Sequence, residues 1–422
     1  MMSEPRFVEG EIRVIGNRWS PSVHAIKDFL TRSRVPFRWL DLETDGQATA
    51  VAESAIPGIE KFPVVIFPDG SALSDPDVRT VAAKLGLDTT PDSRYWDLIV
   101  VGGGPAGVTA SIHAAADGLR TIVVEQAVPG GQISYSGAVE NYPGFPEALT
   151  GVELTRRAVQ QAERFGVEIV VTRKANKLRS EGNQLYVALD DDTELAAHTV
   201  LLALGVSFRW LDAPGCPALV GAGIYYGAAI AEASACANQE IFILGGGNSA
   251  GQAALLLAQY ARNVTIIALE DSLEATMSKY LIDRIRNAKN ITVMTSHTVV
   301  GADGKDHLER ITIRSVKTGE TKTVPATGLF VFIGATPSTE WLEGVIQRDE
   351  NGFIRSGVDC IEGDGIPPRW PLERPPYELE TNAPGVFVAG DVRKGSVKRL
   401  SVAAGEGAEA VHYIFRHCAE VR

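Results

Sequence analysis

The amino-acid sequence predicts an α/β fold class, with two domains of one three-layer type behind a smaller α/β unit. A continuous apolar strand, a glycine-rich turn, a helix and a second apolar strand follow one another in DLIVVGGGPAGVTASIHAAADGLRTIVVE. The same layout returns roughly 140 residues later in EIFILGGGNSAGQAALLLAQYARNVTIIALE, and such repetition indicates related structural units. Before residue 90, shorter apolar strands alternate with amphipathic helices.

The bulk composition excludes several classes of partner. The chain has 422 residues, enough for two to three domains, and a formal net charge of −12. An acidic chain is repelled by a nucleic-acid backbone and by an anionic membrane surface, so we expect neither as a partner. No apolar run reaches the ~20 residues of a membrane span, and the opening MMSEPRFVEGEIRV lacks a signal-peptide pattern. We therefore expect a cytoplasmic protein.

Residues 1–90 predict a small α/β unit that is separate from the two larger domains. The polar stretch DTTPDSRYW, around Pro91, is the expected linker to the rest of the chain. Strands are expected at 12–16, 37–43 and 62–67, and helices at 23–34 and 75–87.

The first glycine turn predicts a Rossmann-like dinucleotide site. Gly102 permits the sharp turn, Gly104 lets a pyrophosphate approach the backbone, and Gly107 lets the helix pack closely on the strand. The free N–H groups and the dipole of the helix favour an anion at this place. Glu125 ends the second strand, where a carboxylate can accept the hydroxyls of a ribose. Pro105 and Ala106 complete the turn.

The second glycine turn has the same frame. Gly245 and Gly247 match the first two glycines, Ala250 is small enough for close packing, and Glu270 follows the second strand. This pattern predicts a second nucleotide site, although an empty, vestigial site remains an alternative. Asn248 and Ser249 lie within this turn.

From about residue 95 to its end, the chain resembles the low-molecular-weight bacterial thioredoxin reductases, with motifs over three quarters of its length. The matching motifs, in order, are GGGPAG, GGQISYSGAVENYPG, VLLALG, GVFVAGDV and KRLSVAAGEG. The third motif departs from the family, because Leu204 stands where threonine is usual. The resemblance implies FAD as the cofactor, with further contacts at Gly131, Gln132, Asn141, Ala203, Gly205, Gly390, Asp391, Arg399 and Leu400.

The order of these motifs implies a discontinuous FAD-binding domain. GGGPAG and GVFVAGD must meet the same cofactor, although the second glycine turn lies between them in the sequence. We therefore expect an FAD-binding domain at 95–216 and 327–418, interrupted by an NAD(P)-binding domain at 217–326. Like most of its relatives, the protein is expected to be a homodimer.

The chain lacks the dithiol of that family. The family's CxxC lies shortly before the second glycine turn, and the corresponding stretch here, GIYYGAAIAEAS, places Gly227 and Ile230 at the two cysteine positions. Neither side chain can form a thiolate. Cys236 is nearby, but a lone thiol cannot close an intramolecular disulfide, and we interpret it as a small buried residue.

The N-terminal unit resembles glutaredoxin, which implies a thioredoxin fold. That family's active site is WCxxCH, and this chain offers W-S-P-S-V-H at 19–24. Ser20 and Val23 stand at the cysteine positions, and Pro63 stands where the fold keeps a cis-proline. The resemblance implies a redox-inactive domain at 1–90, whose role the sequence leaves open.

The residues after the second nucleotide strand bear on the choice of nicotinamide cofactor. Family members that use NADPH have a basic patch there, whereas this chain has Glu270, Asp271 and Glu274. A carboxylate repels a 2′-phosphate but accepts a 2′-hydroxyl, so the sequence weakly favours NADH over NADPH. The alternative is that these acids form only a solvated turn. The nearest basic residues are expected to be Arg262 and Lys279.

Three functions remain open. In the favoured one, electrons pass from NAD(P)H through FAD to an unidentified acceptor, such as a quinone, a dye, oxygen or a small redox protein. Flavin chemistry needs no protein nucleophile, so no catalytic side chain is expected. In the second, external thiols or a recruited partner protein serve disulfide metabolism. In the third, the protein is a non-catalytic flavin or nucleotide sensor. The insert at Trp370–Tyr377 receives no function.

Overall fold

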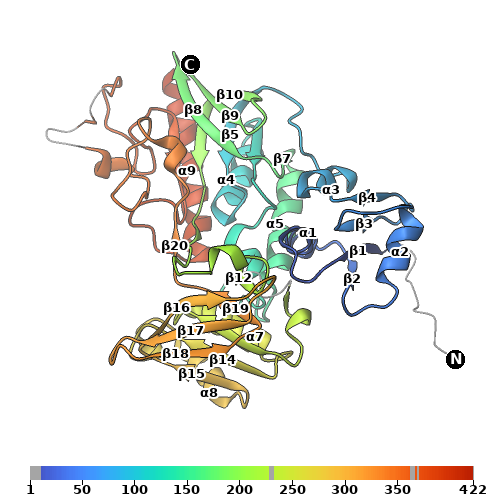
Figure 1. The fold of residues 1–422 in the computed structure, drawn as a ribbon. Helices are drawn as coiled ribbons and strands as arrows, with labels where there is room; N and C mark the ends of the chain where they lie inside the picture. The colour runs from blue at the N-terminus through green and yellow to red at the C-terminus, as the bar shows by residue number, and fades with distance from the viewer. Residues whose placement is uncertain (1–10, 228–231, 362–365, 368–369, 422) are drawn as a thin grey trace. The chain divides into compact units, whose positions relative to one another are not determined.

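The computed structural model describes residues 11–227, 232–361, 366–367 and 370–421 (Figure 1). The chain divides into two compact units, each built from two segments. Unit one contains Met1–Val81 and Phe208–Gly334, and unit two contains Ala82–Ser207 and Ala335–Arg422. Helices and parallel strands occur together in both units, so the predicted α/β class is confirmed. No helix in the described part of the chain is long and apolar enough to cross a bilayer.

The first segment of unit one forms a four-stranded sheet in the order β2-β1-β3-β4. β1 pairs in parallel with β2 and antiparallel with β3, and Ile15, Leu40 and Val64 contribute to the core beneath. The peptide bond before Pro63 is cis, as the resemblance implies. The elements are β1 (Ile12–Gly16), α1 (Pro21–Arg32), β2 (Phe37–Asp41), α2 (Ala48–Ala55), β3 (Val64–Ile66), β4 (Ala72–Ser74) and α3 (Val78–Lys84).

Helix α1 begins two residues earlier than the sequence pattern predicts. Ser20 is extended, and its hydroxyl accepts a hydrogen bond from the N–H of Val23 at 3.4 Å, which caps the helix. Pro21 then occupies the first helical position, where a missing N–H costs nothing. Helix α2 and strand β4 were not predicted. Helix α2 has no side-chain hydrogen bond at its N-cap, so its start carries no sequence signal.

The second segment of unit one has three layers. Along β13, Ile241 and Ile243 pack against α7 and α8, whereas Phe242 and Leu244 pack against the β16–β17 sheet. A strand buried on both faces reads as a continuous apolar run, as observed. The central sheet is parallel in the order β12 (Ile224–Tyr226), β19 (Gly328–Val331), β13 (Glu240–Leu244), β14 (Asn263–Ile267) and β15 (Ile291–Met294). The covering elements are α7 (Asn248–Leu257), α8 (Lys279–Asn287), β16 (His297–Asp303), β17 (Arg310–Ser315) and β18 (Thr321–Pro325).

Unit two contains a seven-stranded mixed sheet in the order β7-β6-β5-β10-β9-β8, with β21 also paired to β10. Strands β5, β6, β7, β10 and β21 are parallel, and β8 and β9 run antiparallel. Its strands are β5 (Tyr95–Val101), β6 (Thr121–Val124), β7 (Glu168–Val170), β8 (Ala175–Glu181), β9 (Gln184–Leu189), β10 (Glu194–Leu202) and β21 (Val386–Val388). Its helices are α4 (Pro105–Ala116), α5 (Gly151–Arg164) and α9 (Leu400–Val421).

Candidate functional site

In the first glycine turn, between β5 and α4, two glycines have no space for a side chain and a third has free space beside it. A Cβ on Gly102 (φ +108°) would lie 2.3 Å from the carbonyl oxygen of Ala203, and a Cβ on Gly107 would lie 1.9 Å from that of Gly102. At Gly104, by contrast, a Cβ would meet no atom within 4 Å. Because the open position lies directly before the N-terminus of α4, the turn fits the diphosphate of a dinucleotide.

Glu125, after β6, holds this turn in place. Its side chain is buried, with Oε2 accepting the N–H of Gly103 at 2.8 Å and Oε1 accepting the N–H of Ala127 at 2.8 Å. The sequence did not predict this structural role. An ionised carboxylate accepts up to about four hydrogen bonds, so these two bonds are compatible with a sugar hydroxyl at the same group.

The C-terminal motifs lie against the first glycine turn. A Cβ on Gly390 (φ +81°) would lie 3.0 Å from the Cβ of Ala106, and a Cβ on Gly407 would lie 2.1 Å from the carbonyl oxygen of Ala106. The structure thus brings the start of α4, the turn after β21 and helix α9 together within unit two. Burial raises the pKa of Asp391, the neighbouring Glu406 adds to this rise, and Lys398 opposes it.

The middle motifs of the sequence also approach this group of residues. A Cβ on Gly131 (φ +55°) would lie 3.4 Å from the Cα of Gly104. The side-chain amide of Gln132 donates to the carbonyl of Val206 at 3.0 Å. Gly205, next to it, is also left-handed, at φ +59°. Asn141 lies in an exposed stretch.

Arg399 and Leu400 stand at the start of α9. Leu400 is the first residue of the helix, where backbone N–H groups lack intrahelical acceptors. The N–H of Arg399 donates to the carbonyl of Val397 at 2.6 Å. The contact of this N–H group with a cofactor remains a prediction.

The second glycine turn, between β13 and α7, repeats the geometry of the first. A Cβ on Gly245 (φ +141°) would lie 2.3 Å from the carbonyl oxygen of Phe332, whereas a Cβ on Gly247 would meet no atom within 4 Å. Ala250 is fully buried. The turn is anchored by Asn248, whose amide oxygen accepts the N–H of Ser278 at 2.7 Å. Ser249 is exposed.

Glu270 differs from Glu125 in one respect. Its Oε2 is buried and has no hydrogen-bond partner among the residues that the structure describes. This oxygen faces the glycine turn, because a Cβ on Gly246 would lie 2.6 Å from it. A buried acceptor without a donor fits a ribose hydroxyl of a bound nucleotide.

The other two acids after β14, Asp271 and Glu274, form ion pairs. The prediction that Arg262 and Lys279 are the nearest basic residues was wrong. Asp271 lies 3.0 Å from Lys317 Nζ and accepts from the hydroxyl of Ser296 at 2.5 Å, which holds the pKa of Asp271 below its ordinary value. Glu274 lies 2.5 Å from Arg286. Lys317 follows β17 and Arg286 lies in α8, so neither base belongs to the strand end that carries the acids. Lys279 pairs instead with Asp283. Arg262 is exposed at the start of β14.

The cysteines are poor candidates for redox chemistry. Among the described residues none of the four forms a disulfide, and all four are buried. Burial raises the pKa of Cys216 to about 11 and that of Cys236 and Cys360 to about 12. Cys236 packs in the core beside α7, as interpreted from the sequence. At the two positions that the resemblance aligns with the dithiol, a Cβ on Gly227 (φ +77°) would lie 2.3 Å from the ring of Phe208, and Ile230 lies outside the described residues.

Within unit one, the WSPSVH loop and helix α1 contact the second segment of the unit. Trp19 stacks on His307, with ring centroids 4.5 Å apart. His24 Nδ1 lies 2.8 Å from Glu232 Oε1, and Lys27 Nζ lies 3.0 Å from Glu232 Oε2. Burial raises the pKa of Glu232, but the hydrogen bond from His24 and the charge of Lys27 outweigh it, so the pKa is lowered.

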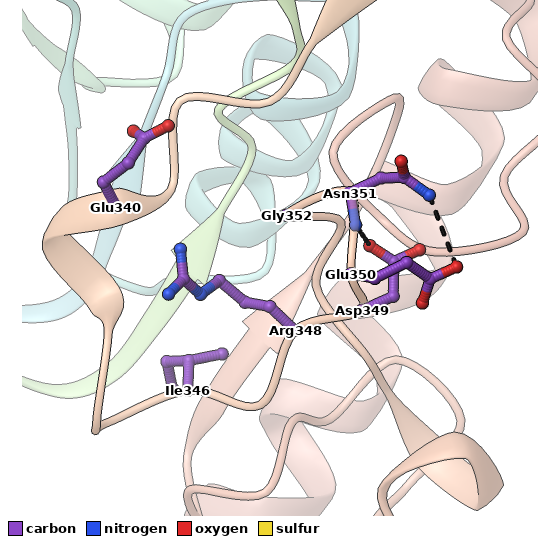
Figure 2. A pocket seen from close by; sticks show the side chains of 7 residues that line it. All are labelled: Glu340, Ile346, Arg348, Asp349, Glu350, Asn351 and Gly352. Atoms are coloured by element: carbon purple, nitrogen blue, oxygen red, sulfur yellow. Dashed lines mark hydrogen bonds between the residues drawn. The ribbon is translucent and has the colours of Figure 1, made fainter.

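A polar pocket of about 460 Å³ lies elsewhere in unit two. Figure 2 shows the Arg348 side chain extending between Glu340 and the turn that carries Asp349 and Asn351. Arg348 donates to the carbonyl of Thr339 at 3.0 Å. Asp349 accepts from the N–H of Asn351 at 3.0 Å, which stabilises the turn. No residue predicted to bind a cofactor lines this pocket.

Comparison with known proteins shows several similar chains. Residues 96–407 match the family model described as pyridine nucleotide-disulphide oxidoreductase. The chain is 34% identical over 322 residues to a thioredoxin reductase of Mycolicibacterium smegmatis, covering 74% of this chain and 94% of that one. It is also 34% identical to the bifunctional thioredoxin reductase/thioredoxin of Mycobacterium leprae, covering 77% of this chain but 66% of that protein. The crystal structure of Lactococcus lactis thioredoxin reductase in its FR conformation superimposes with a TM-score of 0.69 at 28% identity, covering 77% of this chain and 99% of that one.

Proposed function

This chain belongs to the pyridine nucleotide-disulphide oxidoreductase family, and we propose that it delivers electrons without a protein dithiol. It is an FAD-dependent NAD(P)H oxidoreductase of the thioredoxin reductase type, with two Rossmann-like domains. The observation that carries this proposal is the set of four cysteines. The sequence contains no CxxC, and in the described part of the chain each thiol is buried and outside any disulfide. A buried thiol with a raised pKa is not a nucleophile near neutral pH.

The residues of unit two would hold the cofactor. Gly104 leaves room for the diphosphate at the start of α4, Glu125 fixes that turn and meets the ribose, and Asp391 meets the ribityl or pyrophosphate part of the cofactor. Gly131 and Ala203 lie against the same turn. Gln132, Asn141, Gly205, Arg399 and Leu400 are further candidates. When bound, FAD supplies a centre that takes electrons in pairs and passes them on singly or in pairs.

We further propose that the FAD-binding domain comprises 95–216 and 327–418, and the NAD(P)-binding domain 217–326. The breaks between the two compact units, at 207/208 and 334/335, support this division. Gly245, Gly247 and Glu270 would receive the nicotinamide nucleotide. The unbonded oxygen of Glu270 supports NADH over NADPH, because it offers an acceptor for a 2′-hydroxyl and repels a 2′-phosphate.

The N-terminal segment is proposed to be a glutaredoxin-like domain that does not relay electrons. The strand order β2-β1-β3-β4 and the cis-Pro63 support the glutaredoxin-like fold. Ser20, at one former cysteine position, instead caps α1. The homodimer and the cytoplasmic location stay predictions.

One pair of assays tests the proposed electron exit. We expect steady-state NADH oxidation with a soluble dye or a quinone, and negligible turnover in an insulin-coupled assay with several thioredoxins. A thioredoxin reductase that retains its dithiol is the control for the second assay. Thioredoxin turnover as fast as dye reduction would overturn the proposal, and so would protein that gains no flavin spectrum when incubated with FAD.

A further inference from the structure

A single buried carboxylate ties the turn after β21 to helix α9. Glu406, in α9, is 7% exposed. It accepts from the backbone N–H of Gly390 at 2.7 Å, from the guanidinium of Arg393 at 2.6 Å and from the hydroxyl of Ser396 at 2.9 Å. Hydrogen bonds to a charged group are shorter and stronger than neutral ones, so this side chain fixes both ends of the turn.

The same turn carries Asp391 and lies against α4. At Gly390, directly before Asp391, a Cβ would lie only 3.0 Å from the Cβ of Ala106. Gly407, directly after Glu406, is pressed against the carbonyl of Ala106. Glu406 is therefore joined to Asp391 through one turn and to the first glycine turn through one packing contact.

We propose that Glu406 is a positioning residue, which holds Asp391 beside the start of α4 at the place where Asp391 meets FAD. This inference rests on the proposed function. Glu406 bonds to the protein turn and acts on the cofactor through Asp391.

The charges around Asp391 give this role a measurable signature. Among the described residues, the anion Glu406 and the cation Lys398 act on the charge of Asp391, and Asp349 acts on that of Lys398. Glu406 is in turn neutralised by Arg393. Removing the charge of Glu406 therefore lowers the pKa of Asp391. Removing Arg393 leaves Glu406 unbalanced and raises that pKa.

The test is a titration of the full-length apoprotein with FAD, followed by flavin fluorescence over roughly pH 4 to 8. We expect Glu406→Gln to bind FAD about tenfold or more weakly than the wild type, a loss of roughly 1.4 kcal/mol. Asp391 accepts as a carboxylate, so affinity falls as pH drops through its pKa. The pH below which FAD affinity falls should be lower in Glu406→Gln than in the wild type, and higher in Arg393→Gln. Glu409→Gln, on the exposed face of the same helix, is the matched control.

The possible outcomes separate the claims. If the wild type binds no FAD, both the proposed function and this inference fail. If the wild type binds FAD and Glu406→Gln behaves as Glu409→Gln does, this inference alone fails. If the pH at which FAD affinity falls moves in the same direction in both variants, Glu406 has a purely structural role, and this inference is also overturned. If Glu406→Gln does not fold, the direction of the shift in Arg393→Gln decides.

Discussion

At the scale of single residues, Glu125 and Glu270 end equivalent strands but meet different surroundings. Both carboxylate oxygens of Glu125 accept backbone N–H groups at 2.8 Å. In the described part of the chain, Oε2 of Glu270 is buried and accepts none. A buried acceptor left without a donor costs about 1–3 kcal/mol, which a ribose hydroxyl would recover. Glu125 is therefore part of the framework of its turn, whereas we propose that Glu270 accepts a hydrogen bond from a ligand.

Replacing Glu125 tests the first of these roles. We expect Glu125→Ala to weaken FAD binding by about 1–3 kcal/mol, because the turn and the ribose lose a charged acceptor. The thermal midpoint of the apoprotein should also fall, since the N–H groups of Gly103 and Ala127 lose their partner. Calorimetric titration and thermal denaturation measure the two effects, with the exposed Glu147→Ala as control. Unchanged affinity in Glu125→Ala would contradict the assignment.

Replacing Glu270 tests the nucleotide preference. A phosphate charge about 4 Å from a carboxylate costs roughly 4 kcal/mol at an effective dielectric near 20, so NADH should reduce the protein more than tenfold faster than NADPH. Glu270→Arg should narrow this gap. Glu274→Gln should leave it unchanged, because that acid is paired with Arg286. Stopped-flow absorbance with each nucleotide is the measurement. Faster reduction of the wild type by NADPH would show that Glu270 does not face the 2′ position.

At the scale of elements, helix α1 makes a buried ion pair that sequence patterns did not reveal. Lys27 and Glu232 are 2% and 1% exposed, and Lys27 Nζ also lies 4.4 Å from the ring centroid of Trp39. Buried charges persist only when they are paired, because the loss of one partner leaves an unsolvated ion. We therefore expect this pair to hold α1 against the second segment of unit one.

Removing one charge should cost more than removing both. We expect Lys27→Met to destabilise the protein by about 3 kcal/mol, and Lys27→Met combined with Glu232→Leu to recover most of that loss. Urea denaturation, followed with hydrogen exchange of the α1 amides, measures the difference. Lys61→Met, at an exposed lysine of the same segment, is the control. A double variant that is less stable than Lys27→Met would refute this account.

The features that the sequence predicted are those coded over short distances. The glycine turns and the acids after them lie within single strand–turn–helix–strand stretches, so their spacing identified them. Lys317, Glu406 and the Lys27–Glu232 pair were missed because each depends on residues brought together by the tertiary fold. Helix α2 was missed for a different reason, since it is only eight residues long and lacks a side-chain cap.

At the scale of the whole molecule, each compact unit combines residues from two distant stretches of chain. In unit two, α4 and α9 meet at Ala106 and Gly407, although the second glycine turn lies between them in sequence. The resemblance gave this arrangement its rationale, because one cofactor must touch both motifs. From composition and periodicity alone, the helices and strands could be predicted, but not which of them are in contact.

The joint between Lys27 and Glu232 also bears on how such a chain evolves. A shorter chain beginning after the linker would retain Glu232 but lose both Lys27 and His24, its two partners. The truncated protein would expose the apolar surface around Tyr225 and leave the carboxylate of Glu232 there without its two partners. Loss of the N-terminal segment by gene fission would therefore destabilise the fold. Selection thus has reason to retain this segment, and its inheritance needs no redox activity to explain it.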